Sequence, residues 1–263
     1  MRRGRRLLVT GGSGFLGRHV VRHALDRRWT VFAPSSGTLD LRDEAAVRAA
    51  FREFTPHAVV HTAYRRHDRA SIVDATLHVA EAAASTGARM VHVSSDALFA
   101  GRPEPYVEED DPSPVHEYGR AKAVAEAIVE AGLDDAAIVR TSLLYGTGEL
   151  SSHEIAVRDA VEGSRPMTFF TDEYRSPLVV DDLAAGLAEL AERTDVRGRL
   201  HLAGPDRFSR AELAIATARR HGWNVDRLRC STIAEAGLVR PGCVVLDSSR
   251  AASIGLVTRA PFA

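Results

Sequence analysis

Short apolar runs alternate with longer amphipathic stretches through the first half of the chain. The runs are rich in Val and Ile, are bounded by polar or turn residues, and predict strands at 7–10, 30–33, 58–61, 90–94 and 137–141. Helical periodicity fills the intervals at 15–26, 44–54, 72–85 and 118–131. This alternation predicts an α/β fold in which a doubly wound parallel sheet carries helices on both faces.

The pattern becomes mixed after Gly146. It predicts helices at 154–162, 181–193 and 209–221, and strands at 167–170 and 200–202. Ser209 with Glu212 three residues later has the spacing of a capping box. We expect residues 147–263 to form a small lobe over the carboxyl ends of the strands of residues 1–146, where substrates and other ligands of such sheets bind, with elements of the two parts interleaved along the chain.

Residues 99–117 fit no regular element, because they hold Gly101 and four prolines. A loop of this length in a compact domain is usually functional or mobile. Its acidic run, 108–111, is interpreted as a solvated face in preference to a metal site.

A glycine-rich turn follows the first predicted strand. Gly11, Gly14 and Gly17 have the G-x-x-G-x-x-G spacing of a Rossmann-type dinucleotide fold, with strand, turn and helix in the required order. Gly11 permits the tight turn, Gly14 lets the backbone approach a pyrophosphate, and Gly17 lets the helix pack closely on the strand. Backbone N–H groups at the helix start then hold the phosphate charge.

Composition and charge exclude several classes of binding partner. The net charge of −1 gives no basic field for nucleic acid or an anionic membrane, and no run is long enough to cross a bilayer. Cys230 and Cys243 lack metal-ligand spacing, which favours reduced thiols in a cytoplasmic protein. Residues 1–6 are basic, but the apolar run after them is too short for a twin-arginine signal, so the arginines are interpreted as a solvated lead-in.

Tyr118 and Lys122 open a predicted helix and share one face of it. An ammonium beside a phenol lowers the tyrosine pKa, which suits a proton donor near neutral pH. Ser95, after the strand at 90–94, is placed to hold a substrate carbonyl. The alternatives are a surface tyrosine stacked on a lysine stem, and turn chemistry for Ser94 or Ser95.

Together these motifs resemble the extended short-chain dehydrogenase/reductases, particularly dTDP-4-dehydrorhamnose reductases and related sugar-nucleotide reductases. The resemblance covers nearly the whole chain, and its further segments are 61–64, 93–99, 139–146, 174–177, 180–184, 240–241 and 246–247. It implies Ser95, Tyr118 and Lys122 as the catalytic residues. The sequence departs from the family pattern at Ala97, where the family usually has an aromatic residue that contacts the sugar.

The resemblance also implies two sets of binding residues. The cofactor set, which also includes Tyr118 and Lys122, is Gly11, Ser13, Gly14, Phe15, Leu16, Gly17, Ser35, Ser36, Asp40, Leu41, His61, Thr62, Ala63 and Tyr64. The substrate set is Asp96, Tyr145, His153, Arg175 and Arg240, of which the last three suit a diphosphate. His153-Glu154 is no zinc motif, because position 157 is valine.

Cofactor choice depends on the end of the second strand. An acidic residue there favours NAD, and this chain has Ala33-Pro34-Ser35-Ser36 instead. Ser35 and Ser36, helped by Arg18, are suited to a 2′-phosphate, so we expect NADP, with NAD possible. Asp40-Leu41 resembles the family's adenine-side pair; the alternative is a helix N-cap.

The leading hypothesis is an NAD(P)H-dependent reductase of a ketone, on a 4-keto (deoxy)sugar nucleotide or a related metabolite, with Tyr118 as the proton donor. One alternative is an epimerase or dehydratase with tightly bound cofactor, for which Asp96 supplies only half of an acid–base pair. Another is a non-catalytic, NADP-binding regulatory subunit. The family resemblance also suggests a homodimer through the helices at 72–85 and 118–131, where Ala121, Ala123, Ala125 and Ala127 allow close packing.

Overall fold

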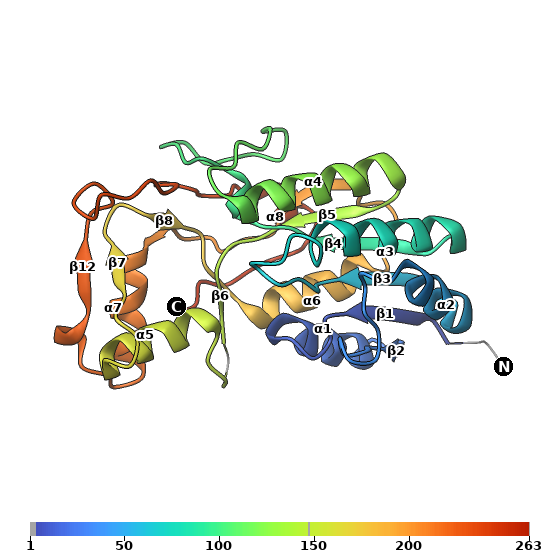
Figure 1. The fold of residues 1–263 in the computed structure, drawn as a ribbon, viewed down its shortest axis with the longest axis horizontal. Coiled ribbons are helices and arrows are strands. Elements are labelled where there is room, and N and C mark those ends of the chain that lie inside the picture. The colour runs from blue at the N-terminus through green and yellow to red at the C-terminus, as the bar shows by residue number, and fades with distance from the viewer. Residues whose placement is uncertain (1–3, 147, 263) are drawn as a thin grey trace.

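A six-stranded parallel sheet forms the centre of the computed structural model, which describes residues 4–146 and 148–262 (Figure 1). The strand order is β10-β5-β4-β3-β1-β2, and every pair is parallel. Their bounds are β1 Arg6–Thr10, β2 Thr30–Phe32, β3 Ala58–His61, β4 Arg89–Val93, β5 Ala137–Arg140 and β10 Gly198–His201. The predicted doubly wound sheet is confirmed. Because β1 lies between β2 and β3, the order reverses at β1, and ligands of such sheets bind at that point.

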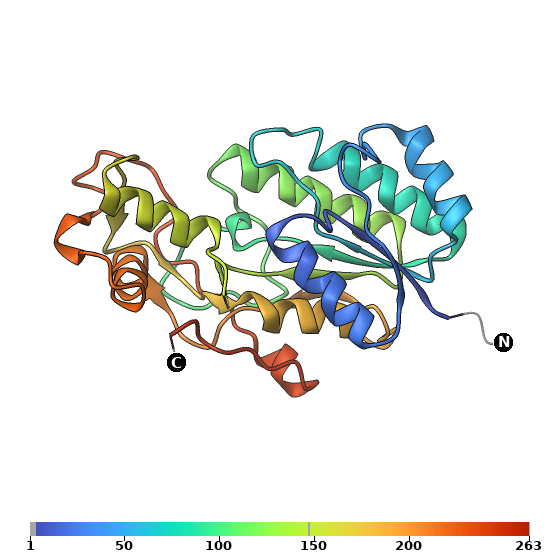
Figure 2. The ribbon, with the colours of Figure 1, turned by 90° about the horizontal axis from the view of Figure 1, so that it is seen from below.

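Helices cover both faces of the sheet (Figure 2). The bounds are α1 Phe15–Asp26 and α6 Val180–Leu190 on one face, and α2 Glu44–Phe54, α3 Val73–Thr86 and α4 Glu117–Gly132 on the other. Leu7 and Val9 of β1 pack in the cluster with α6, whereas Leu8 packs with α2 and α3. Burial on both faces explains why the strands read as unbroken apolar runs.

Part of the second half of the chain returns to the sheet. Helix α6 packs against α1, strand β10 extends the sheet beyond β5, and α8, Ser249–Ser253, lies against β10. The buried core beneath α1 draws Leu183, Leu187 and Leu200 from this segment. The sheet is therefore completed only by residues that follow position 146.

The remaining elements form a smaller lobe, built around α5, Ser152–Glu162, and α7, Arg210–Arg220. Short strands pair there as β7–β12, β6–β9 and β8–β11. Their bounds are β6 Leu144–Tyr145, β7 Thr168–Phe170, β8 Tyr174–Arg175, β9 Leu178–Val179, β11 Phe208–Ser209 and β12 Arg229–Ser231. The predicted capping box at Ser209 is confirmed, and Ser151 with Glu154 forms a second one at α5.

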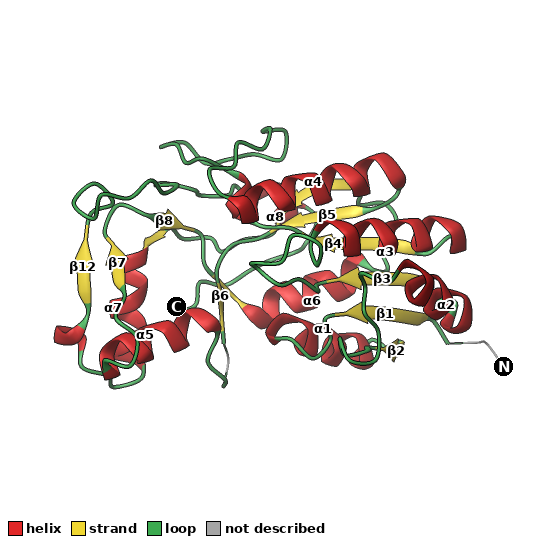
Figure 3. Ribbon diagram, in the orientation of Figure 1, coloured by secondary structure: helices red, strands yellow, loops and turns green. Residues whose placement is uncertain are grey.

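Residues 99–116 form the irregular loop that was predicted (Figure 3). The interpretation of its acidic run as solvated is wrong for Glu108, which is buried and accepts the His201 N–H at 3.0 Å. Arg140 reaches from β5 to the Glu108 and Asp110 carbonyl oxygens, and pairs with Glu126 of α4 at 2.9 Å. These buried contacts fix the loop to the sheet.

The basic N-terminal segment is also more structured than predicted. Arg5 pairs with Glu192 at 3.1 Å and lies over the Trp29 ring, and Arg6 is the first residue of β1. Arg5 is nevertheless exposed, which agrees with the solvated interpretation, whereas Arg6 is partly buried as part of the sheet. Arg2 and Arg3 lie outside the described residues. Throughout the described part of the chain, every helix is too short or too polar to span a bilayer.

Candidate active site

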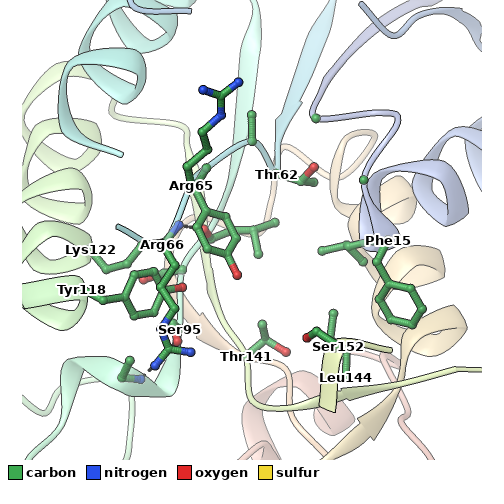
Figure 4. A pocket seen from close by; sticks show the side chains of 18 of the residues that line it. Phe15, Thr62, Arg65, Arg66, Ser95, Tyr118, Lys122, Thr141, Leu144 and Ser152 are labelled. Carbon is green, nitrogen blue, oxygen red and sulfur yellow. Dashed lines mark hydrogen bonds between the residues drawn. The ribbon is translucent and has the colours of Figure 1, made fainter. Parts of the chain in front are cut away.

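A cavity of about 740 Å³ opens at the carboxyl end of the sheet, between the sheet and the lobe. Figure 4 shows Tyr118, Ser95 and Lys122 on one side of it and Phe15 of α1 on the other. Seven basic side chains line it against four carboxylates, although the whole chain has a net charge of −1. The excess of positive charge favours an anionic ligand.

The glycine turn has the geometry that dinucleotide binding requires. Gly11 has a φ of 72°, in the left-handed region. A Cβ on Gly17 would lie 2.0 Å from the Gly11 carbonyl oxygen, so α1 packs against the turn only with glycine there. Gly14 caps α1 without any side-chain hydrogen bond, and no acid lies in the first turn. This uncapped helix start in the cavity wall fits the pyrophosphate of a dinucleotide.

Ser95, Tyr118 and Lys122 come together at the opposite wall. Ser95 follows β4 and accepts the Ala97 N–H at 3.2 Å, which caps the 3₁₀ turn η1, Asp96–Leu98. Tyr118 interacts with Ser95 and Tyr64, and its ring lies 5.5 Å from that of Tyr64. Lys122 is the only lysine of the chain, and its Nζ donates to the Val93 carbonyl oxygen at 2.8 Å.

The electrostatics of this wall correct one prediction. Burial raises the pKa of the Tyr118 phenol well above its ordinary value, Tyr64 raises it further, and Ser95 opposes the shift. Burial lowers the pKa of Lys122 to about 8. The predicted lowering of the Tyr118 pKa by Lys122 is wrong in this structure, because the ammonium faces the Val93 carbonyl and the Tyr64 ring. Tyr118 therefore keeps its proton at neutral pH.

Asp96 is held by its neighbours. Its Oδ2 accepts the Ser142 hydroxyl at 2.6 Å and lies 3.7 Å from Nε of Arg175. Arg175 is itself buried and donates to the Gly242 and Pro241 carbonyl oxygens. Both residues line the cavity, but these contacts fix the side chains within the protein.

Glu173 organises the arginines of the lobe. Its buried carboxylate accepts from Arg240 at 2.6 Å and from Arg175 at 3.1 Å. Desolvation raises the pKa of Glu173, but the hydrogen bond from Arg240 and the charges of Arg175, Arg240 and Arg210 outweigh it, so the pKa is lowered. One carboxylate among three guanidinium groups leaves net positive charge on this wall.

The end of the cavity that is expected to hold the adenine side of the cofactor is more basic than the sequence suggested. Ser36, Asp40 and Leu41 line it with Arg42 and Arg65, which sequence reasoning missed. Hydrogen bonds from Arg42 lower the pKa of Asp40 to about 2. The alternative of Asp40 as an N-cap is wrong, because Asp43 caps α2.

Two of the residues expected to hold a 2′-phosphate are engaged elsewhere. Ser35 is not in the cavity wall, and its hydroxyl pairs with Thr38 at 3.1 Å. Arg18 pairs with Glu149 at 2.6 Å.

Two further predictions are corrected by burial. His61 does not line the cavity, because its ring lies between Thr10 and Thr76, which it meets at 2.7 and 3.2 Å. Tyr145 was expected to contact substrate, but it is 1 % exposed and packs on Phe262.

The other predicted residues line the cavity: Gly11, Ser13, Gly14, Phe15, Leu16, Gly17, Thr62, Ala63, Tyr64, Ser95, Asp96, Tyr118, Lys122, His153, Arg175 and Arg240.

Sequence reasoning also missed Arg66, Arg210 and His116. The Arg66 guanidinium lies 5.2 Å from the Tyr118 ring centroid, and Arg210 lies 3.5 Å from Nδ1 of His153. Burial, together with Arg210, lowers the pKa of His153, so this imidazole is neutral. No cluster of histidine, cysteine and carboxylate side chains within 4–146 and 148–262 is arranged to hold a metal ion.

The alanines of α4 that were expected to favour a dimer are partly used within the chain. Ala121 and Ala125 are buried against Ile72 and Val73 of the neighbouring segment. Close packing at these positions therefore joins α4 to α3 and is not free for a second copy.

Comparisons with known proteins agree with this arrangement. The family model described as "RmlD substrate binding domain" matches residues 5–263. "Methionine adenosyltransferase 2 subunit beta" of Xenopus tropicalis is 32% identical over 98% of this chain and 85% of its own length. "dTDP-4-dehydrorhamnose reductase" of Mycolicibacterium smegmatis is 32% identical over 95% of this chain and 80% of its own. A crystal structure of that reductase from Bacillus anthracis, in complex with NADP, has a TM-score of 0.87 at 24% identity, covering 99% of this chain and 96% of its own.

Proposed function

Since this chain belongs to the RmlD substrate binding domain family of extended short-chain dehydrogenase/reductases, we propose that it is an NADPH-dependent reductase of a ketone on a nucleotide-linked sugar. The observation that carries the proposal is the convergence of Ser95, Tyr118 and Lys122 on the cavity wall opposite the uncapped start of α1. A protein that only binds a dinucleotide needs the glycine turn but not this second wall.

Each residue of the wall has a role in reduction. NADPH, when bound, supplies a hydride to the carbonyl carbon. Ser95 donates to the carbonyl oxygen and orients it toward Tyr118. Tyr118, whose pKa is raised by burial, retains the proton that it gives to the oxygen as negative charge develops there. Lys122 is buried beside Tyr64, and we assign it to the ribose of the cofactor.

The arginines of the lobe support a nucleotide sugar. Arg210 and Arg240 line the cavity beside Glu173, and guanidinium groups bind diphosphates through paired hydrogen bonds. Asp96 and Arg175 are held by protein contacts, so we assign them to shaping the site. Ala97 leaves space where relatives of this family carry an aromatic ring, which favours a sugar other than the rhamnose precursor.

Arg42 and Arg65 support NADP over NAD. They line the adenine end with Ser36, where a 2′-phosphate is the feature that separates the two cofactors. Asp40 pairs with Arg42 at 2.8 Å, so Arg65 is the less neutralised of the two.

The test is oxidation of NADPH and NADH by the purified chain against dTDP- and UDP-linked 4-keto sugars and simple ketones. We expect NADPH consumption in proportion to alcohol formed with one nucleotide sugar. Conversion of the sugar without net consumption of added NADPH would indicate an epimerase. Absence of turnover on every substrate, although NADPH binds, would contradict the proposal of a reductase.

One comparison favours a second candidate, a regulatory subunit. Relatives named as the beta subunit of methionine adenosyltransferase 2 match at 32% and 33% identity over 98% of this chain. On this reading the cavity binds NADP to stabilise a complex with a partner enzyme. Size-exclusion chromatography with a methionine adenosyltransferase catalytic subunit tests it: a stoichiometric complex and no turnover on any ketone would favour the subunit.

A further inference from the structure

His116 lines the cavity and also begins the helix that carries Tyr118 and Lys122. It is the N-cap of α4, and its Nδ1 accepts the Gly119 N–H at 3.0 Å. Its ring lies 6.2 Å from that of Tyr118, and the residue lines the cavity. The catalytic helix therefore begins with a side chain that also faces the space where substrate is expected.

The capping bond fixes which nitrogen carries the proton. An acceptor nitrogen cannot hold hydrogen, so in the neutral imidazole the proton sits on Nε2. Nε2 has no hydrogen-bond partner among the residues that the structure describes, 4–146 and 148–262. His116 thus presents one N–H donor that the fold itself leaves unused.

The surroundings keep this ring neutral. Burial lowers the pKa of His116, and the charges of Arg66, Arg175 and Arg240 lower it further. These arginines come from the loop after β3, from β8 and from the loop after β12. A second proton on the ring would break the cap at Gly119 and add charge beside three guanidinium groups.

We propose that the Nε2–H of His116 donates a hydrogen bond to an oxygen of the sugar, which makes His116 a specificity-determining residue next to Tyr118. The inference deepens the proposed function and depends on its substrate class. The cap holds the donor in one orientation, so the bond selects sugars that carry an acceptor at that place. The arginines then bind the diphosphate of the ligand, and His116 binds its sugar.

His116→Asn separates the two tasks of the residue. Asparagine is a strong N-cap, so it preserves the bond to the Gly119 N–H but lacks a donor at the Nε2 position. His116→Ala loses both. His67→Asn, at an exposed histidine outside the cavity, is the matched control.

The measurements are thermal midpoints, kcat and KM for a dTDP-linked 4-keto sugar with NADPH, and calorimetric affinities for dTDP-glucose and for dTDP in the presence of NADP⁺. For His116→Asn we expect an unchanged midpoint, about 3–10-fold lower kcat/KM and about 3–10-fold weaker dTDP-glucose binding, with dTDP binding unchanged. His116→Ala should also melt earlier, and His67→Asn should match the wild type.

The outcomes separate this inference from the proposed function. If His116→Asn equals the wild type in turnover and in dTDP-glucose binding, His116 is only a cap and the inference is overturned. If the wild type turns over no ketone but binds dTDP-glucose, and His116→Asn weakens that binding alone, the inference stands and the reductase fails. If the wild type binds neither dTDP nor UDP, nor the glucose conjugate of either, the substrate class and the inference both fail.

Discussion

Replacing Lys122 with methionine should make the folded protein more stable while removing its activity. Lys122 is 4% exposed, and its one hydrogen bond to a described residue is to the Val93 carbonyl oxygen. Burial lowers its pKa from 10.5 to about 8, so the fold holds a positive charge at neutral pH in a place that disfavours it. Methionine has a similar length and no charge.

The magnitude follows from the shift. At about 1.36 kcal/mol per pKa unit, the shift from 10.5 to about 8 destabilises the folded protein by roughly 3 kcal/mol at pH 7. The lost hydrogen bond offsets about 1.5 kcal/mol, which leaves a gain of about 1.5 kcal/mol. For a chain of 263 residues this corresponds to roughly 4 °C in thermal midpoint.

The sign of the pH dependence is fixed by the same shift. Between pH 8 and 10.5 the unfolded chain holds more protons on this lysine than the folded chain, so wild-type stability gains with rising pH in that window. Below pH 8 the lysine is protonated in both states, so the buried charge destabilises the folded protein by its full amount. The advantage of Lys122→Met should therefore be largest at pH 7 and smaller at pH 9.5.

Thermal and urea unfolding of both proteins at pH 7 and pH 9.5 make the test. Since Lys122 is the only lysine, no other lysine contributes to the difference. Arg120→Met, an exposed position on the same helix, is the control and should change stability by about 0.5 kcal/mol or less. A Lys122→Met protein that melts at or below the wild-type temperature at pH 7, or whose advantage is the same at both pH values, would refute the reasoning.

Three further predictions concern the turn, the proton donor and the buried ion pair. Tyr118→Phe should lower kcat by about 10²–10⁴-fold while NADPH affinity by fluorescence titration stays within about twofold; retained turnover would exclude Tyr118 as the donor. Gly17→Ala places a Cβ 2.0 Å from the Gly11 carbonyl oxygen and should cost about 1–3 kcal/mol in urea unfolding and abolish NADPH binding, whereas Gly132→Ala, with open space, should change little. Arg140→Met should cost about 3–5 kcal/mol by leaving Glu126 buried and unpaired, and adding Glu126→Leu should restore part of it; equal stability of the two variants would contradict this.

The sheet was predictable because its strands are buried on both faces. Helices α1 and α2 and strand β3 begin and end at the predicted residues, and the other elements of the first half differ by one residue at one end or at both. The lobe was less predictable, because β6, β8, β9 and β11 are two residues long and carry no periodicity. Long-range pairing, not local pattern, creates these strands.

The candidate site was likewise predictable only in part. The glycine turn and the Tyr118–Lys122 pair are local motifs that the sequence displays. The sign of the Tyr118 pKa shift depends first on burial and then on Tyr64, and both arise only in the folded chain. The Val93 carbonyl that holds the Lys122 ammonium is likewise brought near only by folding. The same applies to His116, whose role depends on arginines from three separate segments.

The return of α6 and β10 to the sheet has a consequence for synthesis of the chain on the ribosome. When residue 146 emerges, β5 is an uncovered edge, and the apolar side of β1 lacks the leucines of α6. At that point the guanidinium of Arg89, which is buried in the finished fold, also lacks two of its hydrogen-bond acceptors, the carbonyl oxygens of Leu190 and Val196. We therefore expect the nascent first half of the chain to remain unfolded or chaperone-bound until about residue 201 has left the exit tunnel. Pauses in translation before that point would leave β5 unpaired and the apolar side of β1 uncovered, whereas pauses after it would not.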